Sequence, residues 1–142
     1  MRILAEQSVL LAAIARVASV VERNGQIPIV NNVLISADKA GVWIIGTNLD
    51  MEMRARLEAT VEIAGAVTVP AATLHEIARN APKGAEILLA MDPADPRLTV
   101  RFGRSRYQVP PLPASDFPLF PPPDGVSVGL PSAELATLLA RV

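Results

Sequence analysis

The sequence predicts an α+β fold made of two similar halves, in which an antiparallel sheet is covered by two helices. Three observations support this prediction. Strand-like and helical patterns follow one another in the order strand, helix, strand, strand, strand, and that order begins again near residue 66. A tripeptide ending in arginine recurs at intervals of 63 and 62 residues. The chain has 142 residues, 51% of them apolar, which is enough for one domain with a buried core.

The first half begins with a short strand and a long helix. The strand is predicted over Arg2–Ala5 and the helix over Gln7–Glu22, where apolar residues recur at positions i, i+4, i+7 and i+11 from Leu10. Two strand-like segments follow, Ile27–Ser36 and Val42–Gly46, with a turn signal between them. The helix and strands form one structural unit of the predicted fold.

The last strand of the first half is predicted to be long. Apolar and polar residues alternate without exception over Glu52–Ile63. An alternation with a period of two places all the apolar side chains on one face of a strand. We therefore expect one half-buried strand, paired antiparallel with its neighbours.

The second half repeats the order of the first. A short strand over Ala66–Val69 precedes a helix over Ala71–Asn80, which the sequence Pro82-Lys83-Gly84 ends. Turn-forming residues then separate three more predicted strands, which are Glu86–Ala90, Leu98–Phe102 and Arg106–Val109.

A proline-rich segment divides the chain into parts. Pro110–Pro123 holds seven of the thirteen prolines, which is typical of a stiff, extended connector that does not pack. We assign residues 1–120 to one domain, 121–125 to a linker and 126–142 to the start of a second domain. In that last part Val126–Leu130 resembles a strand and Pro131–Val142 the beginning of a helix. The expectation is a fragment of a longer protein or a truncated relative of one.

The recurring tripeptide indicates an internal repeat. Each copy lies in a predicted helix, and its arginine follows an apolar stripe residue by two positions, roughly 200° around the helix and away from the sheet. An ordinary solvent-exposed arginine is the alternative interpretation. The three copies are Ile14-Ala15-Arg16, Ile77-Ala78-Arg79 and Leu139-Ala140-Arg141.

The composition argues against several classes of function. Cysteine is absent and His75 is the only histidine, so no disulfide, thiolate metal site or second-histidine triad can form. No phosphate-binding glycine loop is present, and the carboxylates of Asp50 and Glu52 lack a catalytic partner nearby in sequence. We expect no enzymatic activity, no catalytic residue, no cofactor and no metal. No apolar run is long enough to span a membrane, and the lack of cysteine permits a cytoplasmic location.

Five segments in register resemble a known family, the beta subunit of bacterial DNA polymerase III, or DNA sliding clamp. The resemblance covers about residues 1–120, and residues 126–142 resemble the start of that family's second domain. The segments are Ile27-Pro28-Ile29 with Asn32, Gly46-Thr47-Asn48-Leu49-Asp50-Met51-Glu52, Val69-Pro70-Ala71, Gly103-Arg104-Ser105-Arg106-Tyr107 and Leu112-Pro113-Ala114-Ser115-Asp116-Phe117-Pro118.

The resemblance implies the DNA-clamp fold, in which each domain consists of two βαβββ halves and two chains form a ring with helices lining its hole. By that resemblance Arg16, Arg23, Asn24 and Arg79 would face duplex DNA, without reading its sequence. The ring would tether DNA polymerase III by enclosing the duplex. The implied partners of the full-length protein are double-stranded DNA, the polymerase, the clamp loader and a second copy of the chain.

The resemblance also implies a ring interface at the strand near residue 107. Arg104, Arg106, Tyr107 and Val109 would contact the partner chain, and Ile77 would support them from the second helix. An ordinary solvated hairpin is the alternative for these arginines. Pro110 departs from the family pattern and should stop ladder pairing after Val109, because proline has no amide hydrogen to donate.

Two other functions fit the same residues. A truncated relative could bind the open interface of a full-length clamp and regulate ring closure. A plain DNA-binding domain could use the arginines between Arg97 and Arg106, in a stretch without acidic residues. The net charge of −1 argues against a protein that holds DNA by bulk charge.

Overall fold

The computed structural model describes residues 1–22, 26–122 and 124–141. Its helices are α1 (Gln7–Val17), α2 (Ala71–Asn80) and α3 (Ser132–Leu139), and its 3₁₀ turns are η1 (Pro28–Asn31) and η2 (Ala114–Asp116). Its strands are β1 (Arg2–Glu6), β2 (Asn32–Asp38), β3 (Gly41–Thr47), β4 (Glu52–Leu57), β5 (Thr60–Ile63), β6 (Gly65–Pro70), β7 (Glu86–Asp92), β8 (Asp95–Phe102) and β9 (Ser105–Val109).

The strands form two antiparallel sheets that exchange their first strands. The five-stranded sheet has the order β5-β1-β7-β8-β9, and the four-stranded sheet has the order β4-β3-β2-β6. Strand β1, from the first half, therefore joins the three strands of the second half, and β6 joins the three strands of the first. This arrangement confirms the duplicated α+β fold with two βαβββ halves.

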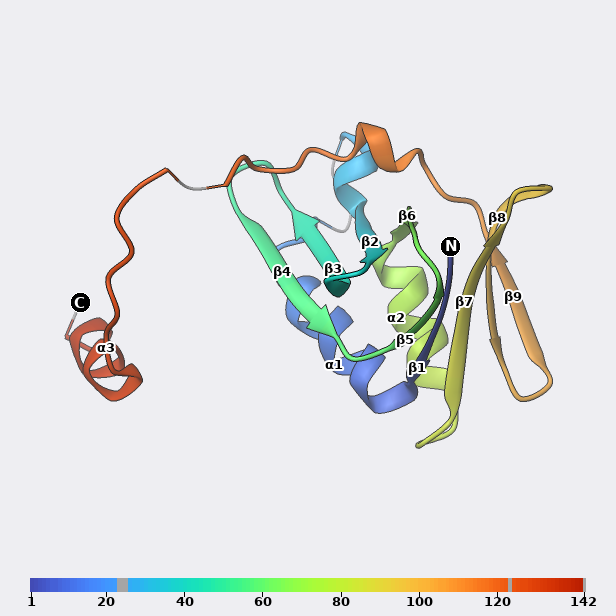
Figure 1. The fold of residues 1–142 in the computed structure, drawn as a ribbon, viewed down its shortest axis with the longest axis horizontal. Coiled ribbons are helices and arrows are strands. Elements are labelled where there is room, and N and C mark those ends of the chain that lie inside the picture. The colour runs from blue at the N-terminus through green and yellow to red at the C-terminus, as the bar shows by residue number, and fades with distance from the viewer. Residues whose placement is uncertain (23–25, 123, 142) are drawn as a thin grey trace.

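The helices α1 and α2 lie side by side and share one core with both sheets (Figure 1). Ile14 of α1 and Leu74 of α2 are fully buried in it, together with Ile35 and Leu89 from the two sheets. The buried amide of Gln7 donates to the carbonyl oxygen of Ala78 at 2.9 Å, which joins the start of α1 to the end of α2. Burial of apolar side chains against both sheets fixes where the outer faces of the helices point.

The first predicted helix is shorter than expected, and the strand after it starts later. Helix α1 ends at Val17, where the hydroxyl of Ser19 donates to the carbonyl oxygen of Arg16 at 2.7 Å and competes with helix continuation. Residues 28–31 form η1 where a strand was predicted from Ile27. Pro28 explains this difference, because its fixed φ suits a first helical position and it cannot donate to a ladder.

The prediction of one strand over Glu52–Ile63 was wrong. Strand β4 pairs with β3 only as far as Leu57 opposite Val42, because β3 begins at Gly41. After Glu58 and Ala59 the chain crosses to the other sheet, where β5 pairs with β1. Apolar and polar residues alternate in β4 and also in β5, because each strand has one face toward the solvent. The sequence pattern therefore does not show where the chain passes from one sheet to the other.

The proline-rich connector packs against the domain, contrary to the prediction of a free spacer. Phe117 is buried against Leu34 and Ile45 of the four-stranded sheet. The hydroxyl of Thr68 accepts from the amide of Leu112 at 3.0 Å and donates to the carbonyl oxygen of the same residue at 2.6 Å. Burial of Phe117 and hydrogen bonds to Leu112 thus hold the connector on the four-stranded sheet. Its proline-rich composition predicted only a stiff, extended chain.

The end of the connector is also held. The carboxylate of Glu52 accepts from the amide of Phe120 at 2.8 Å, and Arg54 donates to the carbonyl oxygen of Phe120 at 3.4 Å. Glu52 and Arg54 also form an ion pair with each other, and the side chain of Glu52 is only 7% exposed. The pair of charged side chains therefore fastens the chain to β4 as it leaves the domain.

Residues 124–141 extend away from this body (Figure 1). The predicted strand over Val126–Leu130 is absent: Val126 and Val128 are 93% and 75% exposed, and the segment has no regular structure. A strand requires a partner for its backbone groups, and no strand in the described part of the chain pairs with this segment. The expected helix does form, as α3, with Leu135, Leu138 and Leu139 exposed.

Candidate nucleic-acid interface and edge strand

The outer surface of the paired helices carries two of the predicted DNA-binding arginines. Arg16 lies in the last turn of α1 and Arg79 in the last turn of α2, and both are exposed. The guanidinium of Arg79 lies 3.9 Å from the carboxylate of Glu76, one turn earlier, in a long and solvated ion pair. Both arginines are therefore available to an anion that approaches the helices from solvent.

A shallow hollow of about 520 Å³ lies between the two helices. Small residues form one wall, among them Ala15 of α1 and Ser19 of the turn after it, and Arg79 lines the hollow from α2. Glu22 and Glu76 line it too, so the surface carries charges of both signs. Mixed charge makes this surface a weak attractor of phosphate groups.

The other two predicted DNA-binding residues, Arg23 and Asn24, lie outside the described residues. Val21 and Glu22 lead directly to them, and Glu22 lines the hollow between the helices. The assignment of Arg23 and Asn24 to DNA stays a prediction, as it does for Arg16 and Arg79.

The predicted interface strand is an edge strand. Strand β9 pairs only with β8, through a two-residue turn in which Gly103 has a φ of +52°. In such a hairpin the residues that flank the turn, Phe102 and Ser105, form a hydrogen-bonded pair, and pairing alternates from there. The backbone groups of Arg106 and Gln108 therefore point away from β8 and are open to a further strand.

The side chains predicted for this interface divide between surface and core. Arg104 and Arg106 are exposed. Tyr107 is 36% exposed, and its ring stacks on that of Phe102 with the ring centroids 5.7 Å apart. Val109 and Ile77 are 4% and 5% exposed and belong to the core.

The side chain of Val109 faces inward and packs in the core of the domain. Tyr107 is the more exposed apolar side chain of this strand. The interface role expected of both residues stays a prediction. Ile77 belongs to the main core of the domain, and the supporting role expected of it stays a prediction.

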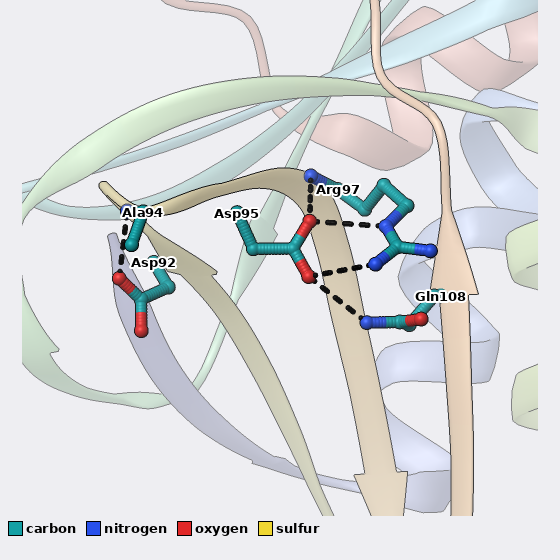
Figure 2. Close-up of polar contacts among 5 residues, drawn as sticks. All are labelled: Asp92, Ala94, Asp95, Arg97 and Gln108. Carbon is teal, nitrogen blue, oxygen red and sulfur yellow. Dashed lines mark hydrogen bonds and ion pairs between the residues drawn. The ribbon is translucent and has the colours of Figure 1, made fainter.

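A polar cluster holds the edge strand at its far end (Figure 2). The Asp95 carboxylate accepts from the Arg97 guanidinium at 3.0 and 3.1 Å and from the side-chain amide of Gln108 on β9 at 3.0 Å. Hydrogen bonds from Arg97 hold the pKa of Asp95 below its ordinary value of 3.8, so the carboxylate stays charged. This cluster was not predicted from the sequence, although Asp95 lies two residues before Arg97 on the same strand face, a spacing that indicates an ion pair.

The described residues hold no group of three histidine, aspartate or glutamate side chains that could bind a metal ion. Nor is any helix in the described ranges long and apolar enough to cross a membrane.

Comparison with known proteins agrees with the resemblance in the sequence. Residues 1–121 match the family described as DNA polymerase III beta subunit, N-terminal domain. The beta sliding clamp of Caulobacter vibrioides strain NA1000 is 41% identical over 143 residues, which cover 99% of this chain and 38% of that protein. The beta sliding clamp of Escherichia coli K12 is 38% identical over 120 residues, or 83% of this chain and 32% of that protein. The chain thus spans well under half the length of these curated relatives.

Solved structures share the fold. The Caulobacter crescentus pol III beta structure matches with a TM-score of 0.90 at 41% identity, over 99% of this chain and 38% of that chain. The Pseudomonas aeruginosa DNA polymerase III subunit beta matches with a TM-score of 0.87 at 31% identity, over the same shares. Two exchanged βαβββ halves, paired helices and an open edge strand define a DNA-clamp domain. More particularly, this chain belongs to the DNA polymerase III beta subunit family.

Proposed function

We propose that this chain supplies the first domain of a DNA sliding clamp, a non-enzymatic ring that tethers DNA polymerase III to duplex DNA. The observation that carries the proposal is the family match over residues 1–121. The side-by-side helices support it, because each presents an exposed arginine on the same outer surface of the domain. In this proposal residues 126–142 begin the second domain and residues 121–125 link the two.

The mechanism follows from weak contacts combined with enclosure. Arg16 and Arg79, with Arg23 and Asn24, contact phosphates without reading bases, so the ring binds any sequence. Glu22 and Glu76 on the same surface keep these contacts weak. Weak contacts permit sliding, and the closed ring prevents escape, so retention on DNA does not depend on high affinity.

The ring closes, in this proposal, through the open edge of β9. The outward backbone groups of Arg106 and Gln108 add a strand from the partner chain, and backbone pairing gives affinity. Arg104, Arg106 and Tyr107 select the partner by charge and shape, with Ile77 and Val109 packed behind them. The polymerase and the clamp loader bind parts of the full-length protein beyond this domain.

A chimera tests the proposal directly. Residues 1–120 replace the matching first domain of the Caulobacter sliding clamp, and the clamp loader of that organism places the chimera on closed circular DNA. We expect the chimera to remain on the circle and to slip off after one cut that linearises it. The double substitution Arg16→Gln and Arg79→Gln should leave retention on the closed circle nearly unchanged, because enclosure and not phosphate contact holds the ring there. Equal retention on circular and cut DNA contradicts topological tethering.

The open β9 edge also supports a second function, in which a truncated relative caps the interface of a complete clamp. Mixing the chain with the intact Caulobacter clamp and measuring ring dimers by sedimentation distinguishes the two. A loss of dimers that Tyr107→Ser prevents supports the capping function. An unchanged dimer population contradicts it.

A further inference from the structure

The face of the five-stranded sheet that points away from the core forms a second, distinct surface. Along β8, residues Leu98, Val100 and Phe102 are buried, so Thr99 and Arg101 between them face outward. A hollow of about 490 Å³ lies on this outward face and reaches from β9 to β5. The DNA-facing residues of the proposed function lie on the helices, so this surface is separate from the DNA contact, and it shares only Arg106 with the proposed ring interface.

Strand register arranges the outward side chains in two rows across the sheet. One row holds Leu88, Arg101 and Arg106, from β7, β8 and β9. The other row runs from Ile63 on β5 through Arg2 and Ala90 to Thr99. The hollow therefore has an arginine end, near β9, and a more apolar end, near β5, where Ile63 is 55% exposed.

The arginine end carries an uncompensated charge. Arg101 lies directly opposite Arg106, at a position without hydrogen bonds between the strands, where side chains approach most closely. Like charges at such a position destabilise a sheet. No ion pair within 4.0 Å involves either arginine in the described ranges.

The acids near the hollow are already engaged. Asp95 is held by Arg97 and Gln108, although Arg106 adds to the field that keeps its pKa low. Asp92 accepts from the backbone of its own turn at 2.8 Å, and Glu62 pairs with Arg2. Asp92 and Asp95 line the hollow themselves, but neither forms an ion pair with Arg101 or Arg106, so these two guanidinium groups are free to bind an external anion.

We propose that the outward hollow of the five-stranded sheet binds an acidic, partly apolar peptide segment of a partner protein. Two carboxylates of the peptide accept hydrogen bonds from the guanidinium groups of Arg101 and Arg106. A guanidinium group can donate two parallel hydrogen bonds to one carboxylate. Apolar side chains further along cover Leu88 and Ile63. Four strand spacings separate β9 from β5, about 19 Å, which is the length of about six extended residues.

A labelled peptide tests this site. The probe is an eight-residue fluorescein peptide with two glutamates at one end and two leucines at the other, and the readout is fluorescence anisotropy with the whole chain. We expect saturable binding that weakens about tenfold or more in the double variant Arg101→Gln, Arg106→Gln, since two charge-assisted contacts are lost. The matched control, Arg16→Gln with Arg79→Gln, removes the same charge from the helices and should keep the affinity within about twofold.

Four outcomes overturn the proposal. The first is a lack of saturable binding up to millimolar peptide, and the second is equal binding of the same peptide with lysines in place of its glutamates. The third is full competition by inorganic phosphate at the peptide's own affinity, which shows a small-anion site. The fourth is an equal loss in Tyr107→Leu, on the opposite face of β9, which shows that the strand edge binds the peptide.

Discussion

At the scale of single residues, Gly46 fixes how closely α1 approaches the four-stranded sheet. A β-carbon at this position would lie 2.4 Å from Cγ1 of Val17 and 2.7 Å from Cγ2 of Val21. Both neighbours are β-branched, and Val17 is fully buried, so neither side chain can rotate away cheaply. The absence of a side chain at Gly46 therefore sets the helix–sheet distance on which the helix surface depends.

The substitution Gly46→Ala tests this packing. We expect it to lower the free energy of unfolding by about 1–3 kcal/mol, because overpacking displaces the helix or forces strained side chains. Urea unfolding followed by circular dichroism measures the change. Gly125→Ala is the matched control, since an added β-carbon there meets no atom within 4 Å. Equal effects of the two substitutions contradict a tight contact.

At the scale of elements, the features predicted best from the sequence were those that depend only on the local spacing of apolar residues, such as the bounds of a helix. Helix α2 begins and ends where its apolar spacing and the following Pro82 indicated. Register and sheet membership depend on distant partners, so the crossing between β4 and β5 left no local signal. The candidate site shows the same limit, because exposure of Arg16 followed from helix geometry but burial of Val109 depended on the core beneath β9.

The connector shows how one polar side chain can decide whether a segment packs. Thr68 is fully buried in β6, where it accepts from the side-chain amide of Asn32 at 3.1 Å and is bonded to both backbone groups of Leu112. Composition indicated an extended chain over these residues, and the tertiary position of Thr68 fixes the beginning of that chain to the sheet, ahead of the contacts of Phe117 and Phe120. The exit of the chain toward residue 120 follows from these contacts.

The substitution Thr68→Val removes the hydroxyl and keeps the shape. We expect a loss of about 1–3 kcal/mol in the free energy of unfolding, because the buried side-chain amide of Asn32 and the partly buried backbone amide of Leu112 lose their acceptor. Hydrogen exchange at the Leu112 amide should quicken as well. Thr68→Ser, which keeps the hydroxyl, should restore protection of that amide. Thr60→Val, at an exposed position on β5, should change neither measurement, and an equal loss there points to a general effect of the substitution.

At the scale of the whole molecule, charge is divided between surfaces and is not concentrated on one. The net charge is −1, yet arginines stand on the helix surface and at the β9 end of the outer hollow. On the helix surface Glu76 lies beside Arg79 and offsets its field. We therefore expect this domain to bind DNA weakly by itself, as the proposed enclosure mechanism requires.

The substitution Glu76→Gln should therefore strengthen binding of the isolated chain to linear duplex DNA. We expect a gain of about twofold to fivefold near 10 mM salt that fades near 150 mM, because the Debye length shrinks from about 30 Å to about 8 Å. Fluorescence anisotropy with two duplexes of unrelated sequence measures it, and both should respond alike. Glu58→Gln makes the same charge change between β4 and β5, and an equal gain there attributes the effect to net charge. A gain confined to Glu76→Gln locates the weak DNA contact on the paired helices, as the proposed function requires.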